Sequence, residues 1–271
     1  MTVELISVTQ LSKEALGVGE GIVNWTAEGV AEAAVDRFPI LRQFVEDGDR
    51  DGAMDWLMQE RFKKSNIAKD RGSEIHKVAE QLHLGNTIEY DEKLEPWIVQ
   101  YRRFLEDFQP AFEMAEAPVY NFTYRYAGTT DGIAKIQGQR VIFDIKTTEH
   151  GPNAKTRKGR PKSRPPFSEV ALQLTMYRRA ERVGLVAERK EIQWKRYYVI
   201  DETAHLEPMP EVEGGVCIVV SPEDYLVVPV DTSERIWKAC RHVIQVAKFQ
   251  TETAKAVFGP AISPKLEEVL S

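Results

Sequence analysis

Residues 128 to 146, with the sequence GTTDGIAKIQGQRVIFDIK, constrain the fold of this chain more than any other stretch. They predict two short strands joined by a tight turn at Gly138-Gln139, because the second run is rich in β-branched and aromatic residues. Side chains alternate along a strand, so we expect Asp144 and Lys146 to point to the same face. Two charges in an otherwise apolar strand are costly to bury unless they pair with each other or bind a metal ion.

A second carboxylate, that of Asp131, stands near the start of the first of these strands, directly before Gly132. A hairpin brings the Asp131 carboxylate close to that of Asp144, and two close carboxylates repel each other unless a cation lies between them. The alternative is an ordinary cross-strand ion pair, which the Asp-Ile-Lys triplet alone would favour. The rest of the chain has to decide between these two interpretations.

Length and composition are those of an ordinary globular protein. With 271 residues the chain can bury a sizeable core in one elaborated domain or in one and a half. It has no long apolar run, and its N-terminus MTVELISVTQ lacks a basic region followed by an apolar core. We therefore expect no membrane span, no secretory signal and a cytoplasmic location. Cys217 and Cys240 are too few for a disulfide framework, and we expect both to be buried.

Positive charge is concentrated in one segment of a chain whose formal net charge is −6. From His150 to Ser168 there are six basic residues and no acidic one, and the prolines and glycines of this segment predict a loop. We call it the basic loop; it follows directly on the strand that carries Asp144. The loop is either a solvated connection or a surface for a phosphate backbone. Its basic residues are Lys155, Arg157, Lys158, Arg160, Lys162 and Arg164.

The N-terminal region predicts helices that are interrupted by short turns. A helix from Gly19 to Phe38 is expected to end at Pro39, and a second one runs from Asp49 to Lys64. We expect the aromatic residues of this region to lie in the core. The apolar face of the second helix consists of Met54, Leu57, Met58 and Phe62.

A separate helix is predicted over residues 68 to 85. His76 lies beside its apolar stripe, where a histidine is either a packing or surface residue or a ligand. The stripe consists of Ile75, Val78, Ala79 and Leu82.

The remainder of the chain predicts a sheet and three more helices. Glu116 stands near the start of the first expected strand, and Gln173 and Tyr177 share one face of the helix after the basic loop. Neither a Walker loop nor a dinucleotide fingerprint occurs, so we expect no nucleotide cofactor. The expected helices are 92–108, 167–184 and 233–255, and the expected strands outside the hairpin are 112–126, 194–200, 215–220 and 225–230.

Taken in order, these residues resemble the RecB-like branch of the PD-(D/E)XK nuclease superfamily. The motifs are Gly72 to His76, Asp131, Asp144-Ile145-Lys146 and Gln173-x-x-x-Tyr177. The chain looks most like the single-domain exonucleases of bacteriophages, which are related to the nucleases of CRISPR adaptation. The resemblance covers about residues 68 to 180 by motif and extends to about 255 by the arrangement of elements.

The resemblance implies an α/β (α+β) fold with a PD-(D/E)XK restriction-endonuclease-like core, in which helices flank a mixed central sheet. Residues 1–110 would be a helical N-terminal region that contributes His76, residues 111–256 the nuclease core and residues 257–271 a tail. One compact domain is expected overall.

For the site, the resemblance implies that His76, Asp131 and Asp144 ligate a Mg²⁺ or Mn²⁺ ion, joined by the backbone carbonyl of Ile145. Lys146 would be the catalytic lysine. Two more residues, Gln173 and Tyr177, would support the site and the DNA. Glu116 matches the acid on the first core strand of many relatives. A histidine among carboxylate ligands favours Mn²⁺.

Two departures from the family pattern are visible. The CRISPR-associated relatives carry four cysteines for an iron–sulfur cluster, and the two cysteines of this chain cannot supply that, so we expect no cluster. Thr130, not proline, precedes Asp131, as is common in this branch.

The expected function is that of a Mg²⁺- or Mn²⁺-dependent deoxyribonuclease, an exonuclease acting on single-stranded DNA or duplex ends. Recombination, repair or replication in a bacterium or a phage-infected cell is the expected setting, with a recombination or replication protein as a further partner. One alternative is a nicking or structure-specific endonuclease with the same site. Another is an inactive DNA- or partner-binding module, which the presence of every motif residue argues against.

Overall fold

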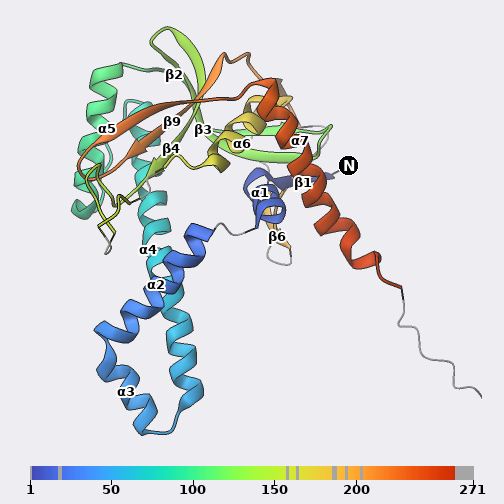
Figure 1. The fold of residues 1–271 in the computed structure, drawn as a ribbon. Helices are drawn as coiled ribbons and strands as arrows, with labels where there is room; N and C mark the ends of the chain where they lie inside the picture. Colours follow the sequence, from blue (N-terminus) through green and yellow to red (C-terminus); the bar gives the residue numbers. More distant parts are fainter. Residues whose placement is uncertain are drawn as a thin grey trace, which may run out of the picture.

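The structure is a computed structural model that describes residues 2–17, 20–156, 159–162, 165–184, 188–192, 195–201 and 204–259. Within these residues it is a mixed α/β fold, in which helices flank a mixed central sheet (Figure 1). The strands are β1 (Thr2–Ser7), β2 (Ala111–Asn121), β3 (Tyr126–Ile136), β4 (Gln139–Thr147), β5 (Arg182–Gly184), β6 (Glu188–Ile192), β7 (Lys195–Asp201), β8 (Leu206–Pro208), β9 (Gly214–Val220) and β10 (Tyr225–Val230).

The α-helices are α1 (Val8–Leu16), α2 (Glu20–Asp36), α3 (Phe38–Glu46), α4 (Arg50–His83), α5 (Glu95–Phe108), α6 (Ser168–Arg178) and α7 (Glu234–Lys248). A 3-10 turn over Glu92–Leu94 precedes α5, and a π turn over Phe249–Thr253 and a 3-10 turn over Ala254–Ala256 follow α7.

The sheet forks at β3. Its strand order is β10-β9-β4-β3-β1-β7-β6, and β2 pairs with β3 along almost the whole length of that strand. The opposite edge of β3 is therefore shared: residues 132–136 pair with β4, and residues 126–127 pair with β1. Residues 128–131 lie between the two partners, so β4 and β1 diverge beside them.

Two layers of helices cover the two faces of the sheet (Figure 1). On one face, α1, α6 and α7 bury Ile142 of β4 and Cys217 of β9; on the other, α4 and α5 bury Phe143 and Ile218 of the same strands. This alternation is what strands with two covered faces require. It confirms the burial expected for Cys217, and Cys240 of α7 is buried too.

The N-terminal region differs from the expectation in three ways. Residues 2–7 form β1, which inserts between β3 and β7, and local sequence did not predict this strand. Pro39 lies in the first turn of α3, where the missing N–H of a proline costs nothing. A new helix, α3, therefore begins at Phe38 directly after α2 ends at Asp36. The two helices expected over 49–64 and 68–85 are one helix, the 34-residue α4, because no glycine or proline interrupts residues 53–71.

An arm formed by α2, α3 and the N-terminal half of α4 projects from the body of the protein (Figure 1). The prediction that aromatic residues of this region lie in the core is wrong for Phe62, which is about half exposed, as are Met54 and Met58 on the same apolar face. Among the side chains of the arm whose burial the structure describes, the buried ones are small or charged: Ala33, Ala53 and Glu60. The Glu60 carboxylate accepts from Arg37 and Lys63, which lie at the arm's surface.

The turn between β2 and β3 comes earlier than expected, because β2 ends at Asn121 and β3 already begins at Tyr126. Phe122 to Arg125 form this turn, which the Asn121 side chain closes by accepting from the N–H of Tyr124 at 2.7 Å. Asp131 consequently lies in the middle of β3 and not at its start. The strands β9 and β10 agree with the prediction. None of the described helices is long and apolar enough to cross a membrane.

Later parts of the chain bring smaller corrections. α6 ends at Arg178, and residues 182–184, predicted to continue that helix, form β5 instead. Residues 188–192 form β6, which was not predicted, and β7 covers the described part of the strand expected over 194–200. The closing helix, expected over 233–255, ends at Lys248, and Phe249 is exposed in the turn that follows.

Candidate metal centre

Asp131 lies in the fork of the sheet. Pairing between β3 and β4 stops at Gly132 and Phe143, one residue short of Asp131. Beyond this point the Asp131 side chain, and not the backbone of β3, bonds to β4: Oδ2 of Asp131 accepts from the N–H of Ile145 at 2.5 Å. Thr130 Oγ1 donates to the carbonyl of Phe143 at 3.2 Å and fills the inner end of the fork. The carboxylate is thus held where two strands separate.

His76 reaches Asp131 from α4. Ile75 and Ala79 of this helix are fully buried, which holds the helix against its neighbours and confirms the predicted stripe. The imidazole Nδ1 of His76 lies 3.2 Å from Oδ1 of Asp131. Gly72, one turn earlier, lies next to the end of β4, where a Cβ would be in van der Waals contact with Thr147 Oγ1 at 3.4 Å. The helix therefore crosses the end of β4 with its histidine directed at the fork.

Glu116 completes a group of three ligand residues. It lies on β2 opposite Asp131, between the register pairs formed by Ala115 and Ala117. Ligand atoms of His76, Glu116 and Asp131 all lie within 4.8 Å of one another. The backbone of Glu116 has φ 46°, in the left-handed region that residues with a side chain rarely occupy. Such strain concentrates at functional positions, where it aims a side chain.

Asp144 and Lys146 form the ion pair expected from the strand pattern, with Nζ 2.6 Å from Oδ2. Asp144 is 2% exposed, and its Oδ1 accepts from Gln173 Nε2 at 3.1 Å. The same nitrogen donates to the Tyr177 hydroxyl at 3.1 Å, so the predicted pair on α6 does face the site. Oδ2 of Asp144 is buried, and the Lys146 ammonium is its partner.

The structure thus distributes the predicted ligands differently from the expectation. Asp144 is not within the group of mutually close ligand atoms; Glu116 is. Ile145 contacts Asp131 through its N–H, and its carbonyl as a ligand stays a prediction. The carboxylate of Asp144 still belongs to the same electrostatic cluster, because its pKa responds to the charges of Asp131 and His76.

Charges in the cluster shift one another's pKa values. Burial lowers the pKa of His76, but the Asp131 carboxylate outweighs it and raises that pKa to about 9. Burial raises the pKa of Asp131, and the positive charge of His76 outweighs it, so the pKa is lowered. Burial raises the pKa of Asp144 to about 6 against the pull of Lys146. Burial lowers the pKa of Lys146, and the two aspartates reverse this and raise it.

The donor set fits a hard divalent cation. Two carboxylates and one imidazole come from three different elements, and the cross-strand carboxylates of Glu116 and Asp131 repel unless positive charge lies between them. Oxygen donors with one nitrogen suit Mg²⁺ and Mn²⁺. The buried carboxylate of Asp144, whose Oδ2 pairs with Lys146, adds a further oxygen donor beside the group.

His83 shows how a nearby histidine can be structural instead. It lies two turns after His76 on α4, stacks on Phe112 with ring centroids 3.9 Å apart and makes a hydrogen bond with the Tyr101 hydroxyl. Burial lowers the pKa of His83 to about 4, so the ring is neutral and serves as packing.

The basic loop has some local order in its described part. Lys155 and Pro161 form an isolated β-bridge, and the N–H of Lys162 donates to the carbonyl of Ala154 at 2.9 Å. The side chains of Lys155, Arg160 and Lys162 are exposed. The remaining predicted DNA contacts, Arg157, Lys158 and Arg164, lie outside the described residues.

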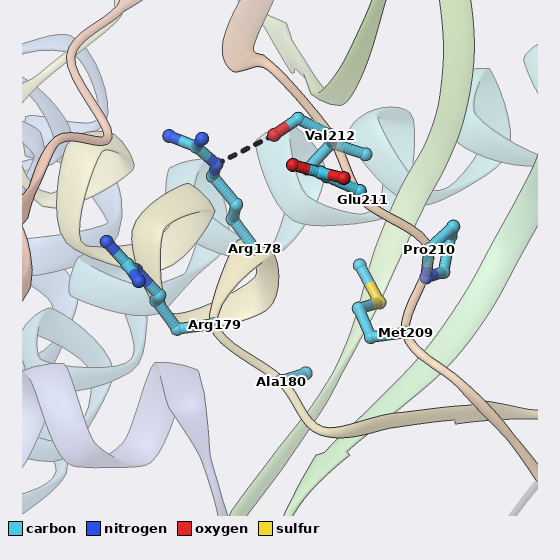
Figure 2. A pocket seen from close by; sticks show the side chains of 7 residues that line it. All are labelled: Arg178, Arg179, Ala180, Met209, Pro210, Glu211 and Val212. Carbon is cyan, nitrogen blue, oxygen red and sulfur yellow. Dashed lines mark hydrogen bonds between the residues drawn. The ribbon is translucent and has the colours of Figure 1, made fainter.

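A pocket at the C-terminal end of α6 shares no residue with the candidate metal centre (Figure 2). Arg178 lines it, and its Nε donates to the carbonyl of Val212 at 3.0 Å, while Nη1 donates to that of Thr232 at 3.2 Å. These bonds hold two segments against the end of α6, the one before β9 and the one between β10 and α7, which is a structural role.

Comparisons with known proteins add little. No family model and no curated protein matches the chain. A solved structure, described as the crystal structure of SSO0001, is 14% identical and aligns over 89% of this chain and 81% of its own, with a TM-score of 0.29. A similarity at that level supports no inference about fold or activity.

Proposed function

We propose that this protein is a Mg²⁺- or Mn²⁺-dependent deoxyribonuclease that degrades DNA from its ends. The observation that carries the proposal is the group of His76, Glu116 and Asp131 with ligand atoms within 4.8 Å, next to the buried ion pair of Asp144 and Lys146. The order of these residues and the mixed sheet support assignment to the PD-(D/E)XK superfamily and its RecB-like branch.

In this proposal the three ligands hold the cation, with Asp144 beside them. A divalent cation so held would lower the pKa of a bound water and neutralise charge on the scissile phosphate. The Lys146 ammonium stabilises negative charge that develops on the phosphate, or orients the attacking water. Gln173 fixes Oδ1 of Asp144, which keeps Oδ2 directed at Lys146.

The basic loop supplies the contacts to the substrate. It leaves the sheet at the end of β4, directly after the strand that carries Lys146. Basic side chains neutralise backbone phosphates without reading bases, which suits an enzyme that degrades DNA of any sequence.

The test is digestion of end-labelled linear single- and double-stranded DNA, and of closed circular DNA, with and without Mn²⁺. Metal-dependent loss of linear DNA with circular DNA intact is expected. Cleavage of circular DNA would establish the endonuclease alternative, and DNA binding without cleavage in any metal would establish the inactive module.

Ligand assignment is tested separately with Asp131→Asn and Glu116→Gln, which we expect to abolish cleavage and weaken Mn²⁺ binding in calorimetry. Glu113→Gln is the matched control, because Glu113 lies on the same strand β2 but pairs with Arg140 at 2.8 Å. Undiminished Mn²⁺ binding by both ligand variants would show that the assignment is wrong.

A further inference from the structure

Arg71 is an arginine that the chemistry described so far does not use. It lies on α4, five residues before His76, and its side chain is only 13% exposed. The guanidinium carbon lies 4.8 Å from the centroid of the Trp97 ring, and Nη1 lies 2.5 Å from Oε1 of Glu149. Its Nε is buried and has no hydrogen-bond partner in the described part of the chain.

The surroundings of Arg71 are built around the start of the basic loop. The Trp97 indole donates to the carbonyl of Thr148 at 2.9 Å, and Thr148 is itself buried. Glu149, the next residue, is 55% exposed and stands three residues after Lys146. The Arg71 side chain is therefore largely buried, and its guanidinium stacks on Trp97. The carboxylate that pairs with this guanidinium, that of Glu149, is at the surface.

We propose that Arg71 binds a backbone phosphate of the DNA substrate, and that Glu149 occupies this position in the free protein. The inference rests on the proposed deoxyribonuclease function. A guanidinium presents a planar fork of donors that fits a phosphate as well as a carboxylate, and stacking on Trp97 holds it ready. Glu149 can move into solvent when a phosphate takes its place, because more than half of its side chain is already exposed.

The location suits a phosphate next to the scissile one. The turn of α4 that carries Gly72 approaches Thr147, and His76 of the following turn contacts Asp131. Arg71 consequently stands on the side of the candidate metal centre where β4 ends and the basic loop begins. A strand bound along the loop would pass this residue before it reaches the cation ligands.

The proposal predicts effects of opposite sign for the two partners. Arg71→Gln should raise KM for single-stranded DNA about tenfold, the value of one charge-assisted hydrogen bond, with kcat changed less than twofold. The salt dependence of kcat/KM should also fall by roughly 0.7, which corresponds to one lost phosphate contact. Glu149→Gln should instead lower KM several-fold, because it removes the competing carboxylate. In the double variant, the effect of Glu149→Gln should vanish.

Lys77 and Glu74 provide matched controls. They form an exposed ion pair on the same helix, with Nζ 2.7 Å from Oε1. Lys77→Gln and Glu74→Gln change the net charge of the protein by the same amounts as Arg71→Gln and Glu149→Gln, and each should leave KM within twofold of the parent. If Arg71→Gln does not fold, Arg71→Lys retains the charge but not the fork, and should raise KM without changing the salt dependence.

A purely structural contact would behave differently. If Arg71 and Glu149 only fasten the loop to α4, removing either partner raises KM, and that result overturns the proposal. Unchanged KM values in both variants of an active parent also overturn it, while leaving the nuclease assignment intact. A parent that does not cleave DNA overturns both.

Discussion

A methyl group added at Gly132 tests how tightly the fork of the sheet is built. The Cβ of an alanine at this position would overlap the carbonyl oxygen of Met114 and lie 2.6 Å from Cζ of Phe143. Carbon atoms need about 3.5 Å or more, so the ring or the strand must move by roughly 1 Å. Phe143 cannot yield easily, because its ring is fully buried among the side chains of α4 and α5. Overpacking of this kind costs about 1–3 kcal/mol, and the backbone contact places Gly132→Ala in the upper half of that range.

In thermal unfolding, a loss of that size should lower Tm by roughly 5–10 °C. Gly214→Ala is the matched control, since Gly214 also lies in a strand of the sheet, has no left-handed backbone and has nothing within 4 Å of where its Cβ would be added. We expect its Tm to stay within about 2 °C of the parent's. Because Asp131 precedes Gly132, a shift of roughly 1 Å should also reduce cleavage by about 100-fold without removing any ligand. A Gly132→Ala protein that melts and cleaves like the parent would refute this account of the fork.

Three further outcomes are expected. His76→Ala should weaken Mn²⁺ binding in calorimetry but leave some cleavage at high Mn²⁺, since two carboxylates remain. A variant that binds Mn²⁺ as tightly as the parent protein would show that His76 is a packing residue and not a ligand. Burial raises the pKa of Glu60, but Lys63 and Arg37 outweigh it and lower that pKa below the ordinary value of 4.5 for a glutamate. The ionised Glu60 carboxylate therefore stabilises the arm at neutral pH, and this stabilisation should be lost as the pH falls below 4.5 and through the lowered pKa. Amide hydrogen exchange should show that the arm of the parent protein loses protection in acid. In Glu60→Gln the arm should already be less protected at neutral pH, and its protection should not fall further in acid. Equal protection of both proteins at pH 7 would contradict this. Substituting serine for exposed basic residues of the loop should raise KM for DNA and flatten its salt dependence, with hydrolysis of bound DNA changed far less; unchanged KM across a salt series would make the loop a solvated connection. The residues to substitute are Lys155, Arg160 and Lys162.

Local sequence determined those parts of the site that lie within one element. Asp144 and Lys146 share a face because strands alternate, and Gln173 and Tyr177 share one because they are four residues apart on a helix. The position of His76 beside a buried stripe follows from helical periodicity in the same way. In each case the relevant spacing is shorter than one element, so the pattern alone suffices.

Tertiary structure decided what depends on distant segments. Whether an amphipathic helix is covered depends on its neighbours, and the apolar face of the arm, with Met54 and Phe62, stays exposed although its periodicity is that of a core helix. The place of β1 between β3 and β7 is equally a matter of long-range pairing, which leaves no mark in the local pattern of residues 2–7.

The ligand group itself belongs to this second category. Glu116 enters it in place of Asp144 because β2 has a left-handed residue opposite Asp131, and because β3 and β4 separate there. The sequence could bring these carboxylates to neighbouring strands. Only the divergence of the strands, together with the backbone conformation at Glu116, decides which of their oxygens meet, since side-chain directions at a fork no longer follow the simple alternation of a paired strand.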